Sequence, residues 1–595
     1  MTREDPAPGS IRRLTAAVRH VVAFLKREQL VLLVVALATG ALAAYAALAF
    51  RGAIAVVQSM AFFTPSERPL TVIAGLPWWQ IAMAPAAGGL IVGLMVYWLL
   101  PGRRPQGVAD VVEASALRGG HMTLRTGLVT ALGSAITLGS GGSAGREGPV
   151  VHLGASIAAS FARRLGLDRG QGRVILGCGV AAAIAASFNA PLAGVLFALE
   201  VVLGHYALSA FAPTVIAAVT ATIISRIHLG AYPAFILPHV TIASFYELPA
   251  FAMLGLVAAV AAIVFVRAIH ASQKVFDAVP VPTWIKPAIA GALVGAIALV
   301  LPQILGVGYE ATDAVLQGSI AFWLLVVLAL AKIVATAITL GGGAIGGVFS
   351  PSLFVGAMTG AAFGAITSFV APDLASTQGT YALVGMGAVA GAVLGAPLST
   401  ILIMVELTGD LAFAVAVMVA VVLATVLYRR VQHYSFFTDV LARRGVRIAG
   451  GHDVGLLREQ RVGDLMVVQP EWVGRNMTVE ELRRRVWTAP LAALVVTPEG
   501  DGPAGLLTVA DLAAAGDGEM AGDLCHPLVV VEQDDHLERA ILVAEESEEE
   551  VLGVAGRQPG SIAGLIRSVD LARAYGRLLR HLRAEEHGER PDLRH

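Results

Sequence analysis

The stretch LGSGGSAGREGPVVHLG, at residues 138–154, lies between two long apolar runs. Four glycines and two serines come before Arg146-Glu147-Gly148, and Pro149 suits the first turn of a helix, after which the apolar pattern resumes. This order predicts a helix that is interrupted inside a membrane. Irregular backbone at that depth is tolerated only where protein buries it or where it borders a cavity. The start of a helix there presents N–H groups to an anion, so the stretch predicts an anion site.

The same arrangement occurs a second time. Residues 339–354 read TLGGGAIGGVFSPSLF, another glycine-rich turn that ends in a proline. Each copy is followed, at a similar distance, by a matching partner, NAPLAGVLFALE at residues 189–200 and GAPLSTILIMVE at residues 395–406. Paired interruptions at corresponding places in two halves indicate an internally repeated transporter fold whose site lies between the repeats.

The composition places most of the chain in a membrane. Of 595 residues, 56% are hydrophobic and only 14% are charged, which is too apolar for a soluble protein. Charged residues are sparse between about residues 29 and 428 and frequent afterwards, which predicts a polytopic membrane domain followed by a soluble one. The two cysteines, Cys178 and Cys525, give neither a disulfide framework nor a metal-binding spacing, and we expect no metal site.

The charge pattern also predicts the domain boundaries and the orientation. Basic residues before the first apolar run place the N-terminus in the cytoplasm, and that run is long enough to be kept as a span. We expect a multi-pass protein of a bacterial-type inner (plasma) membrane with both termini cytoplasmic. The expected parts are a basic segment at 1–28, a membrane domain at 29–445, a linker at 446–460, a soluble domain at 461–584 and a polar tail at 585–595.

The soluble region contains two related segments, GLLTVADL at residues 505–512 and GLIRSVDL at residues 564–571. Each predicts a strand followed by a helix that Thr508 or Ser568 caps. The pair resembles tandem cystathionine-β-synthase-type (CBS) domains, so the C-terminal domain should be a small α/β unit. In that family the matching aspartates, here Asp511 and Asp570, meet the ribose of an adenine nucleotide. A packing and dimerisation module without a ligand remains an equal alternative.

Three ordered motifs in the membrane region carry a second resemblance. GREGP at 145–149, NAPLAG at 189–194 and GVFSP at 347–351 are similar to the signature stretches of the CLC family of chloride channels and chloride/proton antiporters. The resemblance covers roughly residues 30–445. It implies an all-α polytopic domain with inverted internal repeats and a homodimer with one anion pathway in each subunit. Its partners would be chloride, similar anions and the lipid bilayer, without nucleic acid.

The resemblance assigns roles to residues around the breaks. Glu147 would be the external gating glutamate, whose carboxylate occupies an anion site and leaves it when protonated or displaced. Backbone amides near Ser140, Gly148, Val348 and Phe349 would form the pathway. Elementary electrostatics also favours the gate, because a carboxylate in a break of low polarity needs helix-end N–H groups that could otherwise bind a halide.

Two alternatives concern the arginine beside the gate. Glu147 could simply form an ion pair with Arg146, although neighbours at a helix start rarely face each other. Arg146 itself could either add positive potential to the anion pathway or anchor the loop.

The sequence departs from the family at three positions. Gln106 replaces the serine that supplies a hydroxyl to the central anion, and its amide could donate instead or could face cytoplasmic water. Phe437 replaces the central tyrosine and lacks its O–H group. Val201 stands where proton-coupled members carry an internal glutamate, so the proton-relay position is lost, and Glu200 beside it is expected to be structural.

Val201 favours a voltage- and pH-gated chloride channel. A CLC-type Cl⁻/H⁺ antiporter is the alternative, and a non-transporting membrane sensor is the second alternative. No nucleophile–base pair, metal spacing or phosphate-binding loop is present in the sequence, so we do not expect an enzyme. Chloride is the expected ligand, with an adenine nucleotide at the C-terminal pair as a further candidate.

Overall fold

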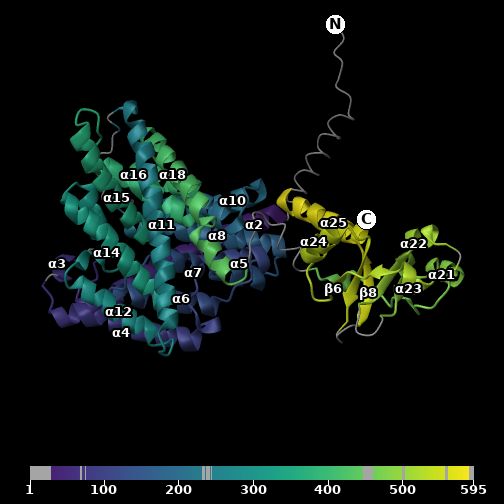
Figure 1. Cartoon of the computed structure of the whole chain (residues 1–595). Helices are drawn as coiled ribbons and strands as arrows, with labels where there is room; N and C mark the ends of the chain where they lie inside the picture. The colour runs from purple at the N-terminus through teal and green to yellow at the C-terminus, as the bar shows by residue number, and fades with distance from the viewer. Residues whose placement is uncertain are drawn as a thin grey trace, which may run out of the picture. The chain divides into compact units, whose positions relative to one another are not determined.

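A computed structural model describes residues 28–66, 70–73, 75–230, 235, 242, 244–446, 460–498, 503–516, 518–556 and 561–587. The chain divides into two compact units, residues 1–447 and 448–595 (Figure 1). The expected basic segment at 1–28, linker at 446–460 and tail at 585–595 lie largely outside the described residues.

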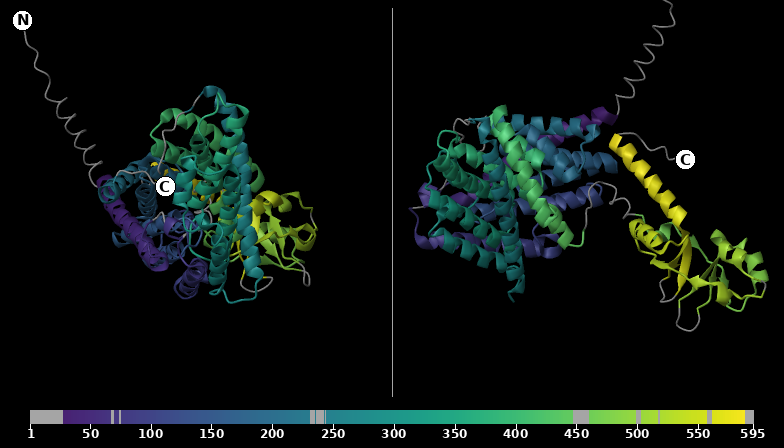
Figure 2. Two further views of the ribbon diagram at one scale, coloured as in Figure 1. Left: turned by 90° about the vertical axis from the view of Figure 1, so that its left-hand side faces the viewer. Right: turned by 45° about the horizontal axis from the view of Figure 1, so that its top comes forward.

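The described part of the first unit is built from helices packed directly on one another, as Figures 1 and 2 show. Among the described residues, eight helices are long and apolar enough to cross a membrane, which confirms the polytopic domain. The helices are α2 Glu28–Phe62, α3 Leu70–Ile73, α4 Trp78–Leu99, α5 Val108–Leu117, α6 Leu124–Gly139, α7 Glu147–Arg164, α8 Arg169–Phe188, α9 Pro191–Phe197, α10 Leu208–Leu229, α11 Leu248–Ala278, α12 Lys286–Ala298, α13 Tyr309–Leu316, α14 Phe322–Gly341, α15 Phe349–Val370, α16 Gln378–Leu394, α17 Pro397–Thr408, α18 Leu411–Gln432 and α19 Phe436–Arg443.

The two glycine-rich breaks have the same local structure. α6 and α14 both end at a glycine, and the chain then turns through Gly141 at φ +98° and Gly343 at φ +87°. Such positive φ angles suit glycine because it has no Cβ. The helices that follow, α7 and α15, begin at Glu147 and Phe349, as the prolines at 149 and 351 predict.

A pair of backbone hydrogen bonds joins the two breaks. The N–H of Gly145 donates to the carbonyl of Gly347 at 2.7 Å, and the N–H of Gly347 donates to the carbonyl of Gly145 at 2.8 Å. The two segments run antiparallel in this bridge, as expected of inverted repeats. The starts of α7 and α15 are therefore held side by side.

The second pair of motifs is also repeated in space. The residues that cap the ends of α8 and α16 are Asn189 and Gly395, both in the left-handed region, and a proline opens the next helix in each case. Glu200 accepts hydrogen bonds from the N–H groups of Leu398 and Ser399, at the start of α17. In return, Glu406 accepts from the N–H groups that follow Pro191 at the start of α9. Each repeat thus caps a helix of the other.

The second unit contains two copies of one fold, which confirms a small α/β C-terminal domain. The first copy is η5 Val462–Asp464, β1 Val467–Val468, β2 Trp472–Val473, α21 Val479–Val486, β3 Ala493–Val496, β4 Gly505–Thr508 and α22 Val509–Ala514. The second is α23 Ala521–Leu524, β5 His526–Pro527, β6 Val530–Glu532, α24 Leu537–Ser547, β7 Val551–Ala555, β8 Ile562–Arg567 and α25 Ser568–His587. The sheets have the orders β2-β3-β4-β5 and β1-β8-β7-β6, so each copy gives its first strand to the sheet of the other.

The bridge between the breaks predicts that Gly347 cannot carry a side chain. A Cβ at Gly347 would lie 2.9 Å from the backbone nitrogen of Gly148, whereas a Cβ at Gly52 in α2 would meet nothing within 4 Å. We expect Gly347→Ala to destabilise the protein by about 1–3 kcal/mol. Gly52→Ala should not destabilise it, because alanine favours a helix interior more than glycine does. Thermal unfolding of the two purified variants in one detergent measures the difference, and equal unfolding temperatures would contradict the prediction.

Candidate anion pathway

Glu147 lies at the meeting point of the two helix starts. Its side chain is 1% exposed. The hydroxyl of Ser350 donates to Glu147 Oε1 at 2.5 Å, and the N–H of Ser350 donates to Oε2 at 3.3 Å. Tyr309, the first residue of α13, donates from its hydroxyl to Oε1 at 3.4 Å. The start of α15 therefore binds the carboxylate of Glu147, where negative charge is favourable.

Arg146 makes several contacts around this carboxylate. Its Nε lies 3.9 Å from Glu147 Oε1, which is a weaker contact than the hydrogen bonds from Ser350. The guanidinium of Arg146 also lies over the ring of Tyr309 at 4.9 Å and donates to the carbonyl of Ser187 at 3.3 Å. Arg146 thus joins neighbouring segments and places a positive charge near the carboxylate of Glu147.

A large cavity of about 350 Å³ brings most of the predicted site residues together. Gln106, from the loop before α5, is 8% exposed and lines this cavity, so its side chain is buried in the protein. Phe437 on α19 lines the cavity from a separate helix. The other predicted residues that line it are Glu147, Gly148, Val348 and Phe349.

A small cavity of about 50 Å³ lies near Glu147. It is lined by Arg146 and Tyr309, which both contact Glu147, whereas Glu147 itself lines the large cavity. Gly148 at the start of α7 and Phe349 at the start of α15 also line the large cavity, and N–H groups in the first turn of a helix have no acceptor within that helix. The arrangement can hold an anion at the position that the carboxylate occupies.

Two predicted residues lie elsewhere. Ser140 directly follows α6, where its hydroxyl donates to the carbonyl of Ile136 at 2.7 Å, and it lines neither cavity. Its backbone N–H also donates to Ile136, so this amide is not available to an anion. Val201 lies in the π-helical turn η2 Ala198–Leu203 that follows α9, and it does not line the large cavity either.

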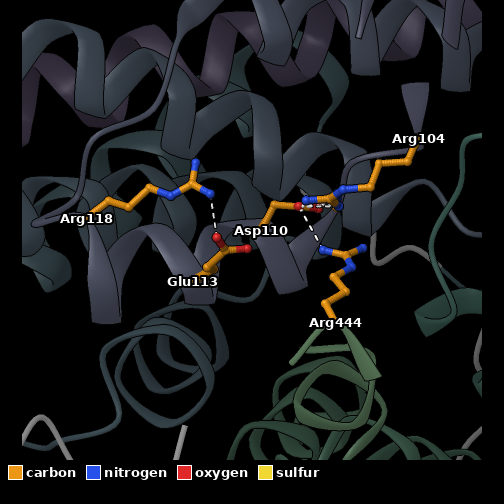
Figure 3. A network of polar contacts seen from close by, with 6 residues as sticks. Arg104, Asp110, Glu113, Arg118 and Arg444 are labelled. Atoms are coloured by element: carbon orange, nitrogen blue, oxygen red, sulfur yellow. Dashed lines mark hydrogen bonds and ion pairs between the residues drawn. The ribbon is translucent and has the colours of Figure 1, made fainter. Parts of the chain in front are cut away.

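Charged residues line the large cavity, and Figure 3 shows the contacts that join three of them, Arg104, Asp110 and Arg444. Asp110 accepts hydrogen bonds from Arg104 at 2.7 Å, from Arg444 at 3.0 Å and from the N–H of Gly107 at 2.8 Å. Since Gly107 follows Gln106 and Arg444 follows α19, Asp110 fixes the loop of Gln106 against the helix of Phe437. Both arginines line the cavity and supply positive charge there.

The candidate nucleotide residues of the second unit are occupied by contacts within the protein. Thr508 and Asp511 form the capping box of α22, which confirms the predicted cap at Thr508. Ser568 is the first residue of α25, and its N–H donates to a carbonyl rather than to a ligand. Asp570 accepts a hydrogen bond from Arg567 at 2.9 Å, and this guanidinium lowers the pKa of Asp570.

Sequence reasoning missed Ser350 and Tyr309. Ser350 falls within the quoted GVFSP motif, where a hydroxyl in the first turn of a helix could have been recognised as a donor. Tyr309 has no sequence signal, because its approach to Glu147 depends on how α13 packs against α15. No group of three or more metal-binding side chains occurs in the described part of the chain.

Two broken helices that bind a buried carboxylate beside a large cavity define a membrane protein with an anion pathway. Residues 88–429 match the family described as voltage gated chloride channel, and the chain belongs to this family, whose members transport anions across membranes. A ClcB-like chloride channel protein of Ralstonia nicotianae is 33% identical over 355 residues, which are 59% of this chain and 82% of the relative.

Solved structures show the same fold. A slow cyanobacterial Cl⁻/H⁺ antiporter aligns with a TM-score of 0.63 at 22% identity, over 70% of this chain and 98% of that one. A eukaryotic CLC transporter aligns with a TM-score of 0.61 at 19% identity, over 91% of this chain and 97% of that one. Together with the family match, these likenesses confirm the CLC-type fold expected from the motifs.

The charged residues that line the large cavity predict a local electrostatic effect on anion flux. Arg444→Ala removes a cavity cation, and we expect roughly threefold lower chloride flux at low ionic strength, with a smaller loss at high ionic strength. Arg118→Ala is the matched control, because Arg118 pairs with Glu113 on the same helix as Asp110 and does not line the cavity. Chloride efflux from liposomes measures both variants, and equal losses would contradict a cavity-specific role for Arg444.

Proposed function

We propose that this protein is a gated channel for chloride and similar anions, with Glu147 as the gate. The observation that carries the proposal is the buried carboxylate of Glu147, held by the start of α15 beside the large cavity. The same N–H groups bind either this tethered carboxylate or a free anion. Conduction then requires that the carboxylate leave.

Protonation provides one route to opening. A neutral carboxylic acid is held less strongly than a carboxylate by N–H donors and by the nearby guanidinium of Arg146, because hydrogen bonds to charged groups are the stronger ones. Acid therefore favours release of Glu147, and an entering anion then accepts from the N–H of Ser350 and from those at Gly148, Val348 and Phe349. Flux should rise as the pH falls.

A channel mechanism is favoured over proton exchange by the residues around position 201. Val201 cannot carry a proton, and both carboxylate oxygens of the neighbouring Glu200 accept hydrogen bonds at the start of α17. Glu200 is thus used as a helix cap. An antiporter would need another proton route to Glu147, and the large cavity that reaches Glu147 is the place where water could supply one.

Inside the large cavity, the anion would meet two side chains that differ from those of the resembled family. Gln106 offers an amide N–H₂ donor to the anion, and Phe437 offers only an apolar ring. Arg104 and Arg444 concentrate anions at their part of the cavity wall, which we assign to the cytoplasmic side because basic residues favour that side.

The remaining assignments follow the resemblances. We propose a homodimer with one pathway per subunit in the inner membrane, with both termini cytoplasmic. The exchange of β1 and β5 between the two copies of the second unit supports a CBS-type pair. That unit would regulate the pathway, with an adenine nucleotide as its candidate ligand at Thr508, Asp511, Ser568 and Asp570.

Opposed gradients separate a channel from an antiporter. In proteoliposomes with a chloride gradient and no initial proton gradient, we expect the reversal potential to follow the chloride equilibrium potential, because conduction is passive. A pH-sensitive dye in the lumen and protein-free vesicles provide the controls. Proton movement driven uphill by chloride would reject the channel and establish the antiporter.

The assignment of Glu147 as the gate leads to a second prediction. Glu147→Gln removes the ionisable carboxylate, so anion flux should be raised and nearly constant when chloride efflux is measured across neutral and acidic pH. Glu113→Gln is the control, because Glu113 is a buried carboxylate that pairs with Arg118 and lines neither cavity. A pH response of Glu147→Gln equal to that of the unmodified protein would show that the gate lies elsewhere.

A further inference from the structure

Ser350 makes a contact with the gate that its neighbours on α15 do not make. Its hydroxyl donates to one oxygen of Glu147 at 2.5 Å, and its own N–H donates to the other at 3.3 Å. One residue therefore binds both ends of the carboxylate. The Ser350 side chain is 3% exposed, so the protein must supply these hydrogen bonds without help from bulk water.

We propose that the hydroxyl of Ser350 is a positioning group that holds Glu147 closed and sets the pH at which the gate opens. This inference rests on the proposed function, in which Glu147 is the gate. It concerns the serine side chain alone. The backbone N–H groups at the same helix start would remain if the hydroxyl were removed.

Among the groups around Glu147, Ser350 makes the shortest contacts with the carboxylate. The hydroxyl of Tyr309 lies 3.4 Å from Oε1, at the long end of hydrogen-bond distances, and Arg146 Nε lies 3.9 Å away. Lys332 on α14, a second cation, donates to the carbonyls of Ile304 and Gly306 instead. Besides Glu147, the wall of the large cavity carries four charged residues, Arg104, Asp110, Asp277 and Arg444.

A hydroxyl acts differently from an N–H group when the gate is protonated. An N–H can only donate, whereas the oxygen of Ser350 can also accept a hydrogen bond from the O–H of a protonated Glu147. The contact therefore persists in both states with its direction reversed. It is stronger with the ionised carboxylate, because charge-assisted hydrogen bonds are the stronger ones. The hydroxyl consequently favours the ionised, closed gate and delays opening to lower pH.

Replacement of the hydroxyl should shift the pH response of flux without abolishing it. For Ser350→Ala we expect half-maximal activation at a proton concentration about tenfold lower, a shift of about one pH unit toward neutral pH. Ser350→Thr retains a hydroxyl and should stay close to the unmodified protein. Ser352→Ala is the matched control, since its hydroxyl is buried in the same turn and donates to the carbonyl of Phe349 at 2.6 Å, away from the gate.

The experiment is chloride flux from liposomes as a function of pH, with each variant first checked for a monodisperse elution profile. An unshifted Ser350→Ala curve, or an equal shift in Ser352→Ala, would overturn the inference. If Ser350→Ala does not fold, Ser350→Cys serves instead, because its thiol is a weak donor and should shift the curve in the same direction.

A double variant separates this inference from the gate proposal. In Glu147→Gln the pH response should already be lost, and adding Ser350→Ala should restore none of it. A pH response that persists in Glu147→Gln rejects the gate itself. If that response is lost while Ser350→Ala alone leaves the curve unshifted, only the role of Ser350 is rejected.

Discussion

The antiparallel pair of hydrogen bonds between Gly145 and Gly347 is the constraint on which the pathway depends. It holds the starts of α7 and α15 together and leaves no room for a Cβ at Gly347. Because of this contact, the carboxylate on one repeat reaches a serine on the other, 203 positions away in the sequence. Without the bridge, the helix starts would be two separate weak anion sites. With it, the two helix starts form one site, for which a tethered carboxylate and a free anion would compete in the proposed mechanism.

Local sequence patterns predicted the parts of this site whose form depends on a few neighbouring residues. Glycines followed by a proline specify a turn and a helix start in any context, so both breaks and the position of Glu147 followed from the quoted motifs. Ser140 shows the limit of that reasoning, because its N–H and hydroxyl are used inside α6. Tyr309 could not be predicted, since its contact with Glu147 depends on packing between distant helices.

Ion pairs join charged side chains that line the large cavity, and they also fix the segments that form its wall. Asp110 neutralises part of the charge of two arginines while it joins the loop of Gln106 to the segment after α19 (Figure 3). The buried carboxylate of Asp110 accepts hydrogen bonds from three donors. Its loss would leave the guanidinium groups of Arg104 and Arg444 close together with no negative charge between them. Asp110 lies in the first turn of α5, where an acidic residue is common whatever its partner. Arg444 could not be assigned to it, because the two residues lie far apart in the chain.

The reciprocal caps of Glu200 and Glu406 have a consequence for biosynthesis. A ribosome delivers the repeats in order, so the carboxylate of Glu200 enters the bilayer before Leu398 and Ser399 have been made. The N–H groups at the start of α9 likewise lack their carboxylate acceptor until Glu406 has been made. Neither cap can therefore form before the chain has been made as far as the second repeat, and the pair is complete only once synthesis has passed residue 406.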